Sequence, residues 1–230
     1  MLTFADKTIL FFRDLKFNGR LPQGTSIMNP FSENKDVFPV VSDFYRKYYS
    51  DYRTRHLIMG INPGRFGGGL TGIPFTDSIR LREKCGLSIP GIQSYETSSV
   101  FVYEMIDRYG GPEKFYGDYY ISSVSPLGFT SAGRKGKEVN YNYYDSKDLT
   151  ESISGFVVDS LRLQLAFGIE RDICFCLGTG KNFRFFSKLN EEHRFFERIV
   201  PLEHPRFIMQ YRLKQKGYYI ENYIEKLRNI

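Results

Sequence analysis

Strand-like segments alternate with helical segments along the chain, and this alternation constrains the fold more than any other feature. Amphipathic helical patterns separate four short apolar segments, which are His56–Ile61, Tyr119–Val124, Asp172–Leu177 and Arg198–Leu202. In a chain of 230 residues, this order predicts an α/β domain with a short, largely parallel sheet covered on both faces. Such sheets bind ligands beyond the carboxyl ends of their strands.

Recurring apolar residues define the helices. From Leu149 to Phe167 they follow helical spacing; Asp148 and Glu151 are expected to cap the start of this helix, and Gly168 ends it. Further helices are expected at Thr3–Phe17, Asp36–Tyr49, Val102–Tyr109 and Ile220–Leu227. We therefore expect a single domain over residues 1–230, with residues 1–50 as its helical N-terminal extension.

A polar residue or a glycine lies at the end of each predicted strand. Asn62, Ser123, Gly178 and His204 each end a strand or follow one closely. Because the carboxyl ends of parallel strands share one edge of the sheet, these four residues are expected to line a single cleft.

The first strand leads into a glycine-dense segment, residues 60–75, which reads Gly-Ile-Asn-Pro-Gly-Arg-Phe-Gly-Gly-Gly-Leu-Thr-Gly-Ile-Pro-Phe. Its two prolines restrict the backbone, and its two aromatic residues, Phe66 and Phe75, have no use in a flexible spacer. The pattern is typical of a loop that wraps a flat ligand and a reacting water, with Asn62 as the polar residue at its apex.

The overall charge suits a polyanionic partner. Lys and Arg outnumber Asp and Glu by 32 to 26, which gives a formal net charge of +6. Aromatic residues make up 17% of the chain, all of them Phe or Tyr, and such rings either fill a core or stack on bases.

Cysteine usage and hydropathy exclude several classes of protein. Three cysteines are too few for a disulfide framework or a four-thiolate cluster, so no metal is expected. The apolar segment Ile9–Phe12 is short and lies between Lys7 and Arg13, which excludes a transmembrane or signal segment. We expect a cytoplasmic protein.

The glycine-dense segment resembles the first active-site motif of the uracil-DNA glycosylase superfamily, most closely that of its single-strand-selective monofunctional (SMUG) branch. There, Gly-x-Asn-Pro-Gly-x-Phe-Gly and Thr-Gly-x-Pro-Phe follow one another at the spacing found here. Further motifs follow in the family order, namely Arg82-Glu-Lys-Cys-Gly-Leu, Gly110-Gly-Pro-Glu-Lys-Phe, Ser125-Pro-Leu and His204-Pro. The resemblance implies a three-layer α/β/α sandwich with about four parallel strands and neither a metal nor an organic cofactor. It also implies a hydrolase that cleaves the N-glycosidic bond of uracil, or of a modified or deaminated base, in DNA.

The resemblance also implies roles for individual residues. Asn62 would orient the attacking water, and His204 would stabilise the negative charge on the departing base. The base would lie against Phe75, in a pocket formed by Ile61, Gly64, Phe66, Phe75 and Ser123. Gly64 leaves space for 5-substituted uracils, because other branches carry a bulky residue there.

A second set of residues is expected to contact the DNA backbone: Pro63, Arg65, Arg134, Lys135, Lys137, Lys181, Arg206 and Arg212. Three of them lie in the long polar segment Thr130–Asp145, which is either a DNA-contacting loop or a plain solvated one. Lys181 follows Gly178-Thr-Gly, which lacks the pattern of a nucleotide-binding loop but is expected to hold a phosphate on backbone N–H groups.

Two departures from the SMUG pattern affect recognition. The branch reads the uracil edge with an Asn, but Ser123 stands at that position, and losing a bidentate base contact lowers discrimination by about 1–3 kcal/mol. After His204, a compact polar loop is replaced by a segment with Phe207, Ile208, Met209 and Tyr211. These residues either wedge into a base step or form a helix packed on the body.

Two alternative functions remain open on the sequence. One is a catalytically silent member that binds nucleic acid or nucleotides, and the other is a small-molecule hydrolase on the same fold. We expect a monomeric DNA glycosylase acting on single- or double-stranded DNA.

Overall fold

A four-stranded parallel sheet forms the centre of the protein, in a computed structural model that describes residues 1–133 and 136–230. Its strands lie in the order β3 (Tyr119–Ser123), β2 (Arg55–Gly60), β6 (Ile169–Leu177) and β7 (Arg198–Leu202). All three neighbouring pairs are parallel. The four predicted strands are thus confirmed, and β6 begins earlier than expected because Ile169 already pairs with Arg55.

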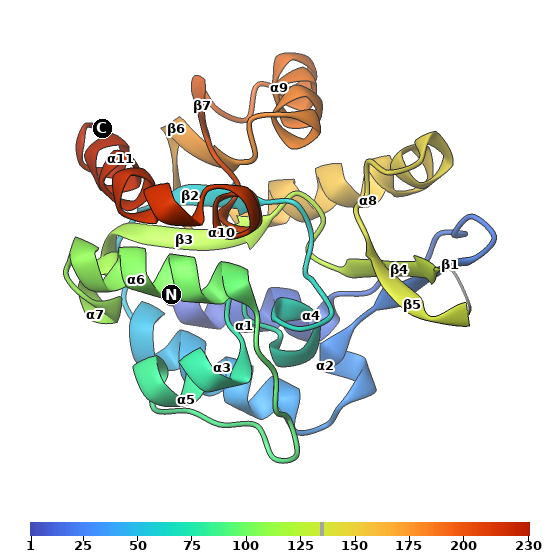
Figure 1. The fold of residues 1–230 in the computed structure, drawn as a ribbon, viewed down its shortest axis with the longest axis horizontal. Helices are drawn as coiled ribbons and strands as arrows, with labels where there is room; N and C mark the ends of the chain where they lie inside the picture. Colours follow the sequence, from blue (N-terminus) through green and yellow to red (C-terminus); the bar gives the residue numbers. More distant parts are fainter. Residues whose placement is uncertain (134–135) are drawn as a thin grey trace.

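Helices flank this sheet (Figure 1). They are α1 (Phe4–Asp14), α2 (Pro30–Glu33), α3 (Val37–Tyr49), α4 (Gly68–Thr71), α5 (Ser78–Cys85), α6 (Thr97–Tyr109), α7 (Pro112–Asp118), α8 (Lys147–Leu165), α9 (Lys181–His193), α10 (Pro205–Tyr211) and α11 (Lys216–Arg228), with a 3-10 turn at Leu213–Gln215. The expected cap of α8 is wrong: Ser146 is its N-cap, and the Ser146 side chain accepts from the Leu149 N–H. Within the described residues, no helix is both long enough and apolar enough to cross a membrane.

Adjacent tyrosines of β3 show how helices cover both faces of the sheet, because successive side chains of a strand point to opposite faces. The Tyr119 ring packs against Tyr109 of α6, and its hydroxyl donates to the Leu227 carbonyl of α11. The neighbouring Tyr120 packs against Phe4 of α1 and contacts Gln164 of α8. This arrangement is the expected three-layer α/β/α sandwich.

The structure corrects the expectation of a long loop over residues 130–145. This segment contributes to an antiparallel sheet of three strands in the order β1 (Thr25–Met28), β4 (Gly128–Ala132) and β5 (Glu138–Tyr141). The N-terminal 50 residues are therefore not purely helical, since they supply β1. The short polar strands lack a marked apolar alternation, and β1 and β4 pair across about a hundred residues of sequence, which local patterns do not reveal.

Candidate active site

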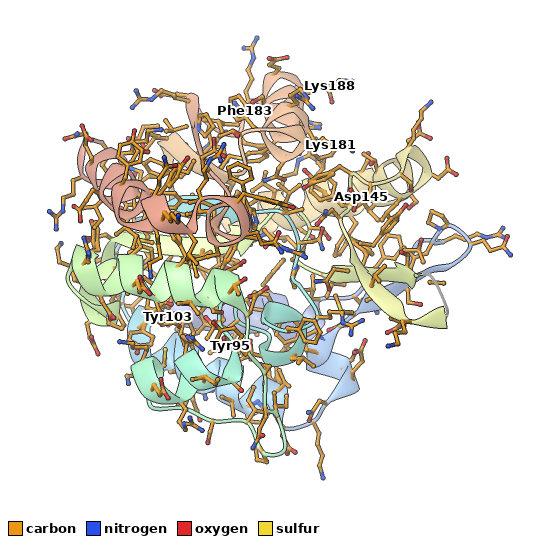
Figure 2. The ribbon with its side chains drawn as sticks, in the orientation of Figure 1. Tyr95, Tyr103, Asp145, Lys181, Phe183 and Lys188 are labelled. Carbon is orange, nitrogen blue, oxygen red and sulfur yellow. The ribbon has the colours of Figure 1, made fainter. Side chains whose placement is uncertain are left out.

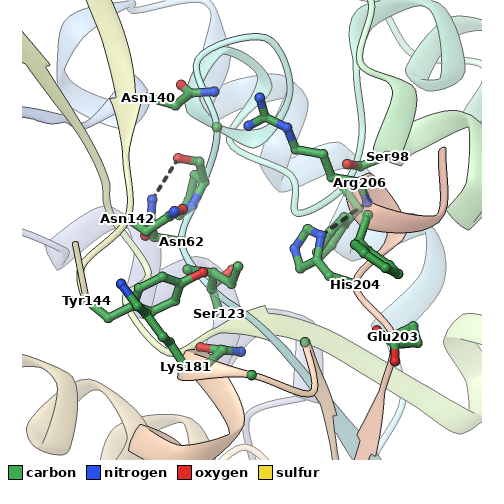
Figure 3. A pocket seen from close by; sticks show the side chains of 18 of the residues that line it. Asn62, Ser98, Ser123, Asn140, Asn142, Tyr144, Lys181, Glu203, His204 and Arg206 are labelled. Atoms are coloured by element: carbon green, nitrogen blue, oxygen red, sulfur yellow. Dashed lines mark hydrogen bonds between the residues drawn. The ribbon is translucent and has the colours of Figure 1, made fainter. Parts of the chain in front are cut away.

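A cleft of about 580 Å³ lies at the carboxyl edge of the parallel sheet. The strand ends bring together residues that are far apart in the sequence: Asn62 follows β2, Ser123 ends β3, Lys181 follows β6 and His204 follows β7. Figure 3 shows Asn62 and His204 on opposite walls of the cleft, with Ser123 between them. The predicted convergence at one edge of the sheet is confirmed.

Gly60, at the end of β2, leaves space for the aromatic wall of the cleft. A Cβ atom at this position would lie 2.8 Å from Cε2 of Phe75 and 3.2 Å from Oγ of Ser123. Phe75 has a φ of 52°, a left-handed conformation that is rare for a bulky residue. The Ser99 hydroxyl donates to the Phe75 carbonyl at 2.7 Å and helps to hold it. The Phe75 ring is thus fixed against the strand ends.

His204 is held in one tautomer by the helix that it begins. It is the N-cap of α10, and its Nδ1 accepts from the Arg206 backbone N–H at 3.1 Å. Burial lowers the pKa of His204 to about 4, and the positive charge of Arg206 acts in the same direction. The imidazole is therefore neutral near pH 7, and because Nδ1 accepts, its proton is on Nε2. His204 is an uncharged hydrogen-bond donor, with its ring centroid 5.8 Å from that of Phe75.

The Asn62 amide is oriented by the segment that follows β5. The Tyr143 N–H donates to Asn62 Oδ1 at 3.0 Å, and Asn62 Nδ2 donates to the carbonyls of Tyr141 at 3.3 Å and Pro63 at 3.4 Å. A carbonyl oxygen carries two lone pairs, so Oδ1 can accept one further hydrogen bond from a water. The second sheet thereby positions the apex of the glycine-dense loop.

Asn182 stands where a nucleotide-binding loop carries a Ser or Thr hydroxyl, and here it has a structural role. Its side chain is 2% exposed and donates to the carbonyls of Leu177 at 2.9 Å and Gly60 at 3.5 Å. Its Oδ1 accepts from the Tyr143 hydroxyl at 2.7 Å. Asn182 therefore joins the ends of β6 and β2 to the β5–α8 connection and stabilises the floor of the cleft.

Several residues of the cleft lining were not identified from the sequence. They are Glu96, Ser98, Asn140, Asn142, Tyr144, Glu203 and Gln210. Burial, followed by the nearby charge of Asp77, raises the pKa of Glu96 to about 7, while Arg206 acts against this shift. No local pattern marks Glu96, because it precedes α6 and reaches the cleft only through packing.

The structure brings nine of the expected site residues into the cleft lining and leaves others outside it. Those within it are Ile61, Asn62, Pro63, Gly64, Phe75, Ser123, Lys181, His204 and Arg206. Phe66 was assigned to the base pocket, but its side chain is 49% exposed and stacks on the Arg65 guanidinium, 4.7 Å from the ring centroid. Arg65 in turn donates to the Glu138 carbonyl of β5 and does not line the cleft. Arg65 therefore attaches the loop to the second sheet, and Phe66 packs on Arg65.

Two further basic residues, Lys137 and Arg212, do not line the cleft. Lys137 is exposed in the β4–β5 connection, and Arg212 lies over the Phe207 ring at 5.6 Å, after the end of α10. Arg134 and Lys135 fall outside the described residues.

The segment after His204 is a helix packed on the body that also presents aromatic side chains to the cleft. It is a helix, α10, whose Ile208 is fully buried against the body. Phe207 and Tyr211, one turn apart, are 37% and 67% exposed and line the cleft, with ring centroids 5.6 Å apart. One face of α10 thus anchors the helix, and another presents two aromatic rings beside the cleft.

Comparison with known proteins identifies the family. Residues 46–228 match the model of the Uracil DNA glycosylase superfamily. The crystal structure of wild-type Pedobacter heparinus SMUG2 superposes with a TM-score of 0.96, at 55% sequence identity, and the match covers 99% of this chain and 98% of that one. No curated protein matches the sequence. The chain belongs to the SMUG-like branch of the uracil DNA glycosylase superfamily and is a DNA glycosylase, a hydrolase of N-glycosyl bonds.

Proposed function

We propose that the enzyme binds an extruded uracil, or a deaminated or oxidised relative, between Phe75 and His204 and hydrolyses its glycosidic bond by a dissociative mechanism. The observation that carries this proposal is the pair of polar groups on opposite walls of the cleft: the neutral donor of His204 and the oriented amide of Asn62. Neither group is a strong base, so stabilisation of the leaving group contributes more than activation of water.

His204 stabilises the departing base. When the C1′–N1 bond breaks, its electron pair leaves with the uracil, and negative charge develops on N1 and O2. The Nε2–H of the neutral imidazole donates a hydrogen bond to O2, and this hydrogen bond becomes stronger as the charge grows. The low pKa of His204 means that the ring keeps this role without carrying a charge into the buried site.

Asn62 positions the nucleophile. A water that donates to the free lone pair of Oδ1 adds its oxygen to C1′, and its proton passes to solvent or to the uracil anion. The products are the free base and an abasic site. The Asn62 amide is held by the hydrogen bond that it accepts from the Tyr143 N–H and by the one that it donates to the Tyr141 carbonyl. This fixed position lowers the entropic cost of orienting the water.

The pocket recognises the base by stacking and by a few polar groups. Phe75 stacks on the ring, and the Ser123 hydroxyl contacts the N3–O4 edge, with Ile61 and Gly64 completing the wall. A hydroxyl gives one contact where an amide gives two, so the pocket discriminates less strictly between bases that differ at this edge. This arrangement favours a substrate range that extends beyond uracil.

The DNA strand crosses the mouth of the cleft, next to Pro63, Lys181 and Arg206. The exposed rings of Phe207 and Tyr211 are suited to replace or stack on bases displaced by extrusion. Lys137 and Arg212 lie further out, where they would contact phosphates away from the lesion. Lys188 lies further along α9 than Lys181 and outside the cleft lining (Figure 2).

Single-turnover excision from an oligonucleotide with one uracil tests the proposal, with abasic sites revealed by alkaline cleavage. Removing the oxyanion donor by His204→Ala should lower the rate by about 10²–10³-fold, and Asn62→Ala by at least about 10²-fold. His193→Ala and Asn229→Ala, outside the cleft, are the controls. Wild-type rates in either cleft variant would refute the assigned roles.

A further inference from the structure

The carboxyl group of Glu96 occupies the space that a side chain at position 64 would take. A Cβ atom at Gly64 would lie 3.1 Å from Oε1 of Glu96, and one at Gly67 would lie 2.7 Å from its Cδ. Two glycines of the loop therefore accommodate this one carboxyl group. Since Glu96 and Gly64 both line the cleft, the wall beside Gly64 is polar and acidic.

The Glu96 carboxyl group does not cap the backbone of its own helix. Glu96 is the N-cap of α6, but its side chain makes no capping hydrogen bond. Its backbone is held separately, because the Glu96 N–H donates to Asp77 Oδ2 at 2.8 Å, and Asp77 also caps α5. The main chain is thus fixed by Asp77, and the carboxyl group is directed at the loop.

The proposed function determines which edge of the base meets this wall, and the inference rests on it. Around a uracil ring, O2, N3, O4 and C5 follow in order. With O2 at His204 and the N3–O4 edge at Ser123, the next edge, C5, is left for the part of the lining that contains Gly64 and Glu96. A substituent on C5 would therefore meet the Glu96 carboxyl group.

We propose that Glu96 determines which 5-substituted pyrimidines the enzyme excises. Its carboxyl group accepts a hydrogen bond from a hydroxyl-bearing substituent, such as 5-hydroxymethyl, and repels an anionic one, such as 5-carboxyl. Both the ionised and the neutral carboxyl group contain an acceptor oxygen, so the hydroxyl contact exists in either state. Arg206 lines the same cleft and attracts the Glu96 carboxyl group by its charge, and the Ser99 hydroxyl contacts that carboxyl group, which leaves its remaining lone pairs to the base.

Excision from oligonucleotides that contain uracil, 5-hydroxymethyluracil or 5-carboxyuracil tests this role, each rate being divided by the uracil rate of the same variant. Glu96→Gln keeps the shape and an acceptor but removes the charge and adds a donor. The 5-carboxyuracil ratio should rise by about tenfold or more, the effect of one hydrogen bond to a charged group, while the 5-hydroxymethyluracil ratio stays within about threefold because the amide oxygen still accepts.

Glu96→Ala removes the acceptor, so the 5-hydroxymethyluracil ratio should fall by about tenfold. Glu151→Ala, an exposed glutamate of α8, is the matched control. If Glu96→Gln leaves the 5-carboxyuracil ratio within twofold of the wild-type ratio, the proposal is overturned, and that variant decides the matter even if Glu96→Ala fails to fold. Failure of the proposed function is distinguishable, since the wild-type enzyme would then release none of the three bases.

Discussion

Replacing His204 or Glu96 with Gln should change the pH dependence of stability in opposite directions. The pKa of His204 is lowered from 6.5 to about 4 in the folded protein, so between these values unfolding takes up a proton and acid favours the unfolded chain. The pKa of Glu96 is raised from 4.5 to about 7, so between these values unfolding releases a proton and alkali favours the unfolded chain. In the wild-type protein the two effects oppose each other.

The magnitudes follow from the two shifts, at 1.36 kcal/mol for each pKa unit. Each group changes the free energy of unfolding by about 3 kcal/mol across its own range. Relative to the wild type, His204→Gln should gain about 3 kcal/mol of stability as the pH falls from 6.5 to 4. Glu96→Gln should gain a similar amount as the pH rises from 4.5 to 7.

Urea unfolding of the three proteins at half-unit steps from pH 4 to pH 8 measures these differences. Subtracting the wild-type curve removes the contribution of every other titrating group, as well as any constant cost of the substitution. The measured quantity is the free energy of unfolding of each variant minus that of the wild type, followed against pH. If both differences stay constant within about 1 kcal/mol, or if both change in the same direction, the cleft does not desolvate these side chains. An NMR titration of the His204 ring gives an independent value for its pKa.

Three further substitutions examine how the cleft is built. Gly60→Ala would displace the Phe75 ring and the Ser123 hydroxyl and should lower the excision rate at least about tenfold. The control Gly155→Ala, with open space around its Cβ, should be neutral or stabilising. Equal activity of the two variants would contradict the packing argument. Tyr143→Phe removes the donor to Asn182 and should cost about 1–3 kcal/mol in urea unfolding, and an unchanged midpoint would mean that this hydrogen bond adds nothing. Tyr211→Ala should weaken binding to a lesion oligonucleotide by about 1–3 kcal/mol in a fluorescence titration if the ring stacks on a base, and unchanged affinity would exclude that contact.

Local sequence patterns were sufficient for the central sheet and for much of the cleft. Apolar segments separated by helical patterns predicted β2, β3, β6 and β7, and parallel strands necessarily present their carboxyl ends at one edge. The residues at or next to those ends, Asn62, Ser123 and His204, can therefore be predicted to share the cleft from the sequence. The family motifs supplied their proposed roles, which await the experiments above.

Long-range contacts decided the rest. The sheet of β1, β4 and β5 forms from short polar strands, and its pairing brings Tyr143 to Asn62, 81 positions earlier in the chain. Glu96 reaches the loop only because the start of α6 packs against that loop, where Ser99 donates to the Phe75 carbonyl. The protonation of His204 depends on burial and on the backbone of α10. Composition and periodicity report the preferences of neighbouring residues, whereas the desolvation and hydrogen bonding that set the chemistry of this cleft arise between segments that meet only in the folded protein.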